Sequence, residues 1–182
     1  MIELLSADAL LAAQSASLPE DHWIGQLQRW ADSLPDALQW LGIVLISAIP
    51  FVESYFGAPI GVIVGLHPAV AVATATVGNM LSLIVVVYLA HWVRTAILHR
   101  RDPDRTTTDS PKRERVQKIF DRFGVPGVSI LGPLALPSQI TAPLMVSFGA
   151  NRRAVMAWML VSVILWGTGF ALLGVGLLRL IA

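Results

Sequence analysis

Apolar positions along the chain fall into four stretches of two kinds. Residues 37–65 and 124–149 are apolar but interrupted by prolines and glycines, whereas residues 69–93 and 154–178 are apolar almost throughout. A helix of about 20 predominantly apolar residues is long enough to cross a bilayer. The two uninterrupted stretches therefore predict two transmembrane helices, and the two interrupted stretches need another explanation.

The interrupted stretches predict helical hairpins that enter and leave the membrane on one side. Proline has no N–H group and blocks ordinary helix continuation, and non-helical backbone at membrane depth is tolerated only where protein or a watery cavity surrounds it. We therefore expect two re-entrant hairpins, although two proline-kinked ordinary spans would give a similar pattern. The predicted structural prolines of the hairpins are Pro50, Pro59, Pro133, Pro137 and Pro143.

The two halves of the chain resemble one another in sequence. Residues 57–65, GAPIGVIVG, precede residues 141–149, TAPLMVSFG, by 84 positions. Four positions are identical in this register, namely Ala58 and Ala142, Pro59 and Pro143, Val62 and Val146, Gly65 and Gly149. Together with the repeated order of one interrupted and one uninterrupted stretch, these identities predict a duplicated unit of a hairpin followed by a helix.

Composition and charge assign the chain to a membrane. Of its 182 residues 55% are hydrophobic and 14% charged, whereas about a quarter of residues are charged in soluble domains. Residues 94–122 carry nine of the thirteen Lys and Arg residues, so the positive-inside rule places this loop in the cytoplasm. A nucleic-acid partner is a weaker explanation of this basic run. The absence of cysteine excludes disulfides and thiolate chemistry.

These patterns predict an all-α integral membrane protein with two inverted repeats, each a re-entrant helical hairpin followed by a transmembrane helix. Residues 37–182 form one membrane domain, made of repeat one (37–93), the cytoplasmic loop (94–122) and repeat two (123–182), with both termini outside. Residues 1–36 form either amphipathic helices on the membrane surface or a weakly ordered tail. Their acidic start argues against a secretory signal.

One carboxylate lies within the apolar stretches, and a charge at membrane depth is costly and often functional. Glu53 is therefore the predicted ion, proton or cationic-substrate site, unless its side chain reaches the outer interface. Ser54 and Tyr55 beside it, and Ser138, Gln139 and Thr141 in the second hairpin, are predicted to line the same cavity. Asn79, with Thr76 and Ser82, forms a polar stripe that faces this cavity or makes hydrogen bonds between helices.

Other chemistry is not indicated. The histidines His22, His67, His91 and His99 lie at presumed interfaces or in tails without the spacing of metal ligands. The sequence has no nucleophile elbow, carboxylate pair or phosphate-binding loop, so we expect neither an enzyme nor a cofactor.

Two segments carry a family resemblance, IPFVESYFGAPIGVIVG at residues 49–65 and RFGVPGVSILGPLALPSQITAPLMVSFG at residues 122–149. With the Pro-x-x-Glu pattern at residues 50–53, they resemble the putative small multidrug export family of prokaryotes. The arrangement is more distantly similar to the DedA superfamily of lipid and polyprenyl-phosphate transporters, but that superfamily's arginines are missing from the second hairpin.

The resemblance implies a small transporter of the prokaryotic plasma membrane that exports hydrophobic or amphipathic solutes, with Glu53 as the site of proton coupling. A DedA-like lipid flippase or scramblase, sensitive to Arg152 and Arg153, is one alternative. An accessory subunit of a larger membrane complex is another. Two spans and two hairpins make a thin wall around a pathway, so we expect a homodimer or a partner protein besides the lipid bilayer and a small amphipathic substrate.

Overall fold

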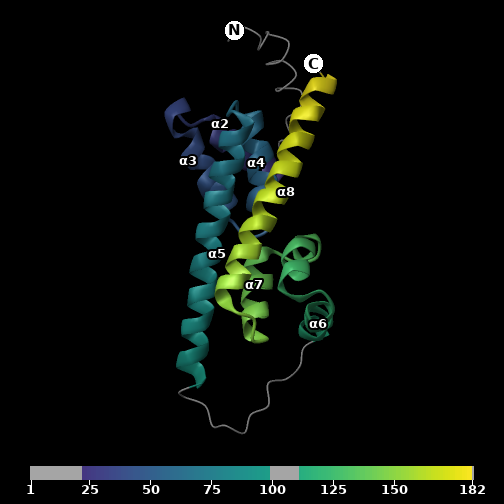
Figure 1. Cartoon of the computed structure of the whole chain (residues 1–182). Coiled ribbons are helices and arrows are strands. Elements are labelled where there is room, and N and C mark those ends of the chain that lie inside the picture. The colour runs from purple at the N-terminus through teal and green to yellow at the C-terminus, as the bar shows by residue number, and fades with distance from the viewer. Residues whose placement is uncertain (1–21, 99–110, 182) are drawn as a thin grey trace. The chain divides into compact units, whose positions relative to one another are not determined.

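The computed structural model describes residues 22–98 and 111–181, and within these ranges it contains seven α-helices, one 3-10 helix and no strand (Figure 1). The all-helical prediction is therefore confirmed for the described residues. The predictions for residues 1–21 and for the centre of the basic loop lie outside them. The elements, in chain order, are α2 (Trp23–Asp32), α3 (Asp36–Ser47), α4 (Glu53–Ile63), α5 (Pro68–Leu98), α6 (Pro111–Leu131), η1 (Gly132–Leu134), α7 (Ser138–Ser147) and α8 (Arg152–Ile181).

Two of the described helices are long and apolar enough to cross a membrane. Their apolar segments are Pro68–Leu89 in α5, with 22 residues, and Arg152–Gly176 in α8, with 25 residues. These segments coincide with the two predicted transmembrane helices. The complete helices extend further, to 31 and 30 residues respectively. Length and apolar composition thus agree with a membrane location.

The chain divides into two compact units. Unit 1 contains residues 1–79 and 163–182, which include α2, α3, α4, the first part of α5 and the last part of α8. Unit 2 contains residues 80–162, which include the last part of α5, α6, η1, α7 and the first part of α8. Each unit therefore combines one predicted hairpin with parts of both long helices.

The core of unit 1 is built around the hairpin of α3 and α4. Its buried apolar side chains come from every element of the unit, and glycines let the helices approach closely. A Cβ atom added at Gly57 of α4 would overlap Ser47 of α3, and one added at Gly78 of α5 would overlap the carbonyl group of Val44. The buried members of this core are Ile24, Ala31, Ile43, Ile46, Val52, Ala58, Ile60, Val64, Ala75 and Ala171.

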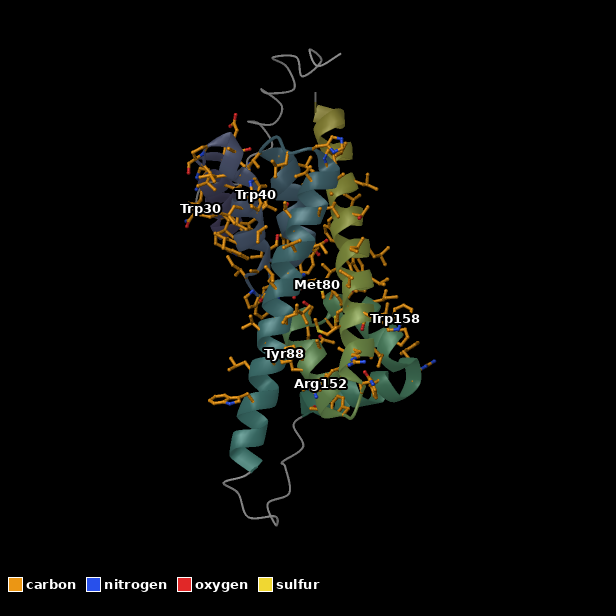
Figure 2. The ribbon with its side chains drawn as sticks, turned by 60° about the vertical axis from the view of Figure 1, so that its left-hand side comes forward. Trp30, Trp40, Met80, Tyr88, Arg152 and Trp158 are labelled. Atoms are coloured by element: carbon orange, nitrogen blue, oxygen red, sulfur yellow. The ribbon has the colours of Figure 1, made fainter. Side chains whose placement is uncertain are left out.

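Exposed aromatic side chains mark the surfaces of both units. In unit 1, Trp30 of α2 is 42% exposed and Trp40 of α3 is 47% exposed (Figure 2). In unit 2, Tyr88 and Trp92 near the end of α5 are 63% and 68% exposed. Tryptophan and tyrosine are enriched where a membrane protein meets the headgroup region. Helix α2 has Ile24 and Ala31 buried, and whether it lies on the membrane surface stays a prediction.

Unit 2 contains the second hairpin. Helix α6 is kinked at Gly124, where φ is 65° and ψ is −169°, and Pro126 follows the kink. The short helix η1 then turns the chain toward α7. The rings of Phe120 in α6 and Phe148 after α7 are packed with their centroids 6.1 Å apart, and Thr141 of α7 lies against Gly132 of η1.

The prolines interrupt the helices at fewer places than the sequence predicts. Pro50 lies in the turn between α3 and α4, and the segment from Pro133 to Pro137 separates α6 from α7. Pro59 and Pro143, in contrast, lie inside α4 and α7. Of the prolines in the second interrupted stretch, Pro137 directly precedes a helix start and Pro143 does not, because α7 has already begun at Ser138. A proline inside a helix removes one hydrogen bond and need not end the helix.

The ends of α4 and α7 have the same local structure. Gly65 and Gly149 follow these helices with φ angles of 97° and 99°. After α4, the N–H of Leu66 donates to the carbonyl of Gly61 at 2.9 Å, and after α7 the N–H of Ala150 donates to the carbonyl of Met145 at 3.1 Å. Both are Schellman motifs, in which a left-handed glycine satisfies the last carbonyls of a helix.

The long helices begin in the same way 84 positions apart. His67 precedes α5, and its Nδ1 accepts a hydrogen bond from the N–H of Ala69 at 3.3 Å. Asn151 precedes α8, and its Oδ1 accepts from the N–H of Arg153 at 2.9 Å. A side-chain acceptor at this position satisfies one of the free N–H groups at a helix start. The local structure thus repeats with the register found in the sequence.

Candidate functional site

The turn between α3 and α4 places Glu53 inside unit 1. Phe51 and Glu53 have φ angles of 72° and 52°, and they are the described non-glycine residues with positive φ. Backbone in this region costs about 1–3 kcal/mol per residue and often occurs at functional sites. The Phe51 side chain is 60% exposed, whereas Glu53 is 1% exposed. The strained turn therefore directs the carboxylate into the unit and the aromatic ring outward.

Ser54 attaches this turn to α8. Its Oγ donates a hydrogen bond to the carbonyl oxygen of Val163 at 2.9 Å. A Cβ atom at Gly167, one helical turn further along α8, would lie 3.3 Å from the Cβ of Ser54. The start of α4 and α8 therefore approach so closely that the hydroxyl reaches the helix backbone. Because Ser54 follows Glu53 directly, this bond also helps to position the carboxylate.

Tyr55 covers the outer side of the same turn. Its hydroxyl donates to the carbonyl oxygen of Phe51 at 3.3 Å, which ties it to the strained segment. Its ring lies 5.1 Å from that of Phe56 and 6.0 Å from that of Phe170 in α8, measured between centroids. Tyr55 thus belongs to an aromatic cluster and is only partly buried.

The predicted polar stripe of α5 is not uniform. Asn79 has no exposed surface, while Thr76 is partly buried with its hydroxyl oxygen enclosed and without a hydrogen-bond partner. Ser82 is partly buried and belongs to unit 2, whereas Thr76 and Asn79 belong to unit 1. The stripe therefore supplies one fully buried amide and one unsatisfied hydroxyl to unit 1.

The candidate residues of the second hairpin are also buried. Ser138, Gln139 and Thr141 are 1%, 4% and 2% exposed. The Ser138 hydroxyl donates to Oε1 of Gln139 at 3.4 Å, and the Thr141 hydroxyl donates to the carbonyl oxygen of Pro137 at 3.1 Å. These polar groups gather at the first turn of α7. Whether they line a cavity together with Glu53 stays a prediction.

Sequence reasoning missed one correspondence between the hairpins. Ser54 and Ser138 are separated by the repeat distance of 84 positions, and both are 1% exposed in the first turn of their helices. The identity was present in the sequence but lies just outside the segment that was aligned. It indicates that a buried hydroxyl at the start of the second hairpin helix is a shared feature of the two halves.

Among the described residues, no group of three or more metal-ligating side chains is close enough to hold a metal ion. His22 and His67 each accept a hydrogen bond from the backbone at a helix start. The chemically distinctive residue of the described structure is thus the buried Glu53.

An all-helical protein with two helices of membrane-spanning length fits the class of helical membrane proteins, and here a buried carboxylate begins one of the short helices. A family model described as putative small multi-drug export protein matches residues 53–168 of the chain. The chain belongs to this family. Among curated proteins and solved structures, no match was found.

Proposed function

We propose that the protein is a small membrane transporter that exports hydrophobic or amphipathic solutes. Its family name points to export, and its two apolar helices support a membrane location. The observation that carries the proposal is Glu53, which is 1% exposed and begins α4 with a φ of 52°. A buried carboxylate in an apolar setting is expensive, and such groups typically bind an ion, a proton or a cationic substrate.

The carboxylate alternates between the protonated and the charged form in the proposed mechanism. When charged it attracts a cationic group, and when protonated it releases that group, so substrate and proton exclude one another. The Ser54 bond to Val163 and the strained turn hold Glu53 in place during this exchange. Export therefore depends on a proton gradient.

The proposed topology is an inverted repeat in the plasma membrane of a prokaryote. The recurring Schellman glycines and the caps at His67 and Asn151 support a duplication of hairpin plus helix. The basic run of residues 94–122 lies in the cytoplasm, which puts the two hairpins on opposite sides of the membrane.

The first test is the substitution Glu53→Gln in protein reconstituted into liposomes with an imposed pH gradient. Tetraphenylphosphonium, a compact lipophilic cation, serves as the transported probe. Glutamine has nearly the same shape but cannot carry the charge, so we expect gradient-driven transport to fall at least tenfold while the thermal unfolding transition is retained.

The matched control is Asp36→Asn, which removes an exposed carboxylate from the first turn of α3. It should transport like the unmodified protein. Transport by Glu53→Gln at the unmodified rate would contradict the role of Glu53. The absence of any gradient-dependent transport by the unmodified protein would contradict the transporter function for such cations.

A further inference from the structure

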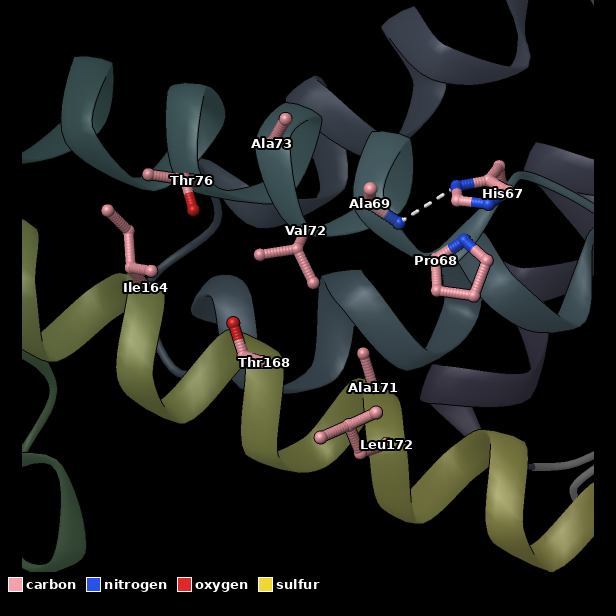
Figure 3. Close-up of a pocket in the computed structure, with 10 residues that line it drawn as sticks. All are labelled: His67, Pro68, Ala69, Val72, Ala73, Thr76, Ile164, Thr168, Ala171 and Leu172. Atoms are coloured by element: carbon pink, nitrogen blue, oxygen red, sulfur yellow. Dashed lines mark hydrogen bonds between the residues drawn. The ribbon is translucent and has the colours of Figure 1, made fainter.

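A pocket lies in unit 1 between the first part of α5 and the last part of α8 (Figure 3). Its volume is about 730 Å³, within the range of about 300–1,000 Å³ that is usual for small-molecule sites. Of the polar residues singled out in the sequence, Thr76 of the α5 stripe lines it, whereas Glu53 and Asn79 do not. The side chains that do are His67, Pro68, Ala69, Val72, Ala73 and Thr76 from the α5 side, and Ile164, Thr168, Ala171 and Leu172 from α8.

The pocket is apolar with a few polar groups at defined places. His67 stands at the start of α5, and its Nδ1 is already used by the N–H of Ala69. The Thr76 hydroxyl is buried without a hydrogen-bond partner, and in Figure 3 the oxygens of Thr76 and Thr168 point toward the space between the two helices. Apolar walls with a small number of polar groups are typical of ligand sites.

One end of this pocket is close to the turn that carries Glu53. Ile164, a lining residue, follows Val163 directly, and the carbonyl of Val163 accepts the hydrogen bond of Ser54. Thr168, another lining residue, follows Gly167, which faces Ser54. Because the rise of a helix is about 1.5 Å per residue, the pocket ends within about one helical turn of the point where Ser54, the residue after Glu53, contacts α8.

The length of the pocket favours a compact ligand over a transmembrane helix as its occupant. Its lining residues extend over residues 67–76 and 164–172. Ten helical residues rise about 15 Å, roughly half of the hydrocarbon core of a bilayer. A transmembrane helix of a second copy would need a groove along the whole span. A compact amphiphile needs only this part, and the turn that carries Glu53 lies next to its Ile164 end.

We infer that this pocket binds the apolar body of a cationic amphiphile that comes from the bilayer, with the cationic group directed toward Glu53. The inference rests on the proposed function and adds to it the substrate class and the site of its apolar part. The Thr168 hydroxyl accommodates the polar edge of the ligand, and the alanines leave room for its rings or chains.

The test fills the pocket by Ala73→Phe and measures the binding of tetraphenylphosphonium to purified full-length protein by equilibrium dialysis in detergent. Ala73 is exposed on α5, so the added ring occupies the pocket without entering the core. We expect saturable binding to the unmodified protein and a loss of affinity of about tenfold or more in the variant, because bulk replaces the apolar contacts of the probe.

The matched control is Ala157→Phe. Ala157 is exposed on α8, outside the pocket, and corresponds to Ala73 at the repeat distance of 84 positions. It should bind the probe like the unmodified protein. Equal binding by both phenylalanine variants, or no saturable binding to the unmodified protein, would overturn the inference.

Two further readouts separate the possible outcomes. If Glu53→Gln abolishes transport while Ala73→Phe transports normally, the pocket inference fails and the transporter function stands. If binding depends on Ala73 but the unmodified protein does not transport, the pocket stands and the transporter function fails.

Phosphate analysis of bound phospholipid identifies a lipid occupant. A loss of lipid with unchanged probe binding in Ala73→Phe would overturn the assignment to a cationic amphiphile.

Discussion

At the scale of single residues, left-handed glycines end the two short hairpin helices. Gly65 and Gly149 have φ angles of 97° and 99°, and a Cβ atom at either position would meet nothing within 4 Å. Space is therefore not what excludes a side chain there. The backbone conformation alone disfavours any other residue, because a Cβ atom crowds the following carbonyl oxygen in this region.

We predict that Gly65→Ala lowers the free energy of unfolding by about 1–2 kcal/mol, the usual cost of this conformation for a residue with a Cβ atom. The measurement is thermal or denaturant unfolding of the purified protein in detergent. Gly169→Ala is the control, since Gly169 also has open space but lies in α8 with ordinary helical φ. There alanine should be neutral or slightly stabilising. Equal effects of the two substitutions would show that the Schellman cap contributes little.

At the scale of elements, the close approach of α5 to α3 explains how the first hairpin is held in unit 1. Gly78 lies so near the carbonyl group of Val44 that a Cβ atom would overlap the backbone. Glycines at helix contacts in membranes allow backbones to come this close. The position cannot relax by turning a side chain, because the atom it meets belongs to the main chain.

We predict that Gly78→Leu destabilises the protein by about 1–3 kcal/mol or more, as overpacking in a tight interior does. The yield of monodisperse protein and its melting temperature measure the effect. Gly169→Leu adds the same side chain to an open position of α8 and should leave both values unchanged. A Gly78 variant as stable as this control would contradict the close contact of α3 with α5.

Much of the element plan could be predicted from the sequence, because it depends on composition and chain breaks. The two uninterrupted apolar stretches correctly predict α5 and α8. Pro50 and Pro137 correctly predict the chain breaks before α4 and α7. Their residue type predicts further interruptions at Pro59 and Pro143, yet both prolines lie within helices. Local residue type predicts a missing hydrogen bond, whereas packing of the surrounding elements decides whether the helix continues.

The candidate site could be predicted only in part. Glu53 is buried, which agrees with the first of the two alternatives for this residue, and the six other polar candidates are buried or partly buried. The hydrogen bond from Ser54 to Val163 and the pocket beside Thr168 could not be predicted from the sequence, because each joins segments about a hundred residues apart. No pattern within one helix indicates which turn of another helix it will touch.

At the scale of the whole molecule, the two long helices leave much of their apolar surface uncovered. In their most apolar windows, 39% of α5 and 28% of α8 are buried within the protein. Apolar surface of this extent is suited to contact with lipid or with another membrane subunit. The homodimer or partner protein predicted from the thin wall of two spans remains a proposal, and chemical crosslinking in membranes tests it.

The inverted topology predicts on which side of the membrane two equivalent residues lie. Leu66 and Ala150 are equivalent residues of the two Schellman motifs, each following a short hairpin helix and preceding a long one. In an inverted repeat these equivalent points lie on opposite sides of the membrane, because the halves have opposite orientations.

The chain has no cysteine, so Leu66→Cys and Ala150→Cys each introduce one unique reactive site. We expect a membrane-impermeant thiol reagent to label Leu66→Cys from outside and Ala150→Cys from the cytoplasm. Labelling of both from one side would mean that the halves are parallel. The repeated caps would then reflect local sequence alone.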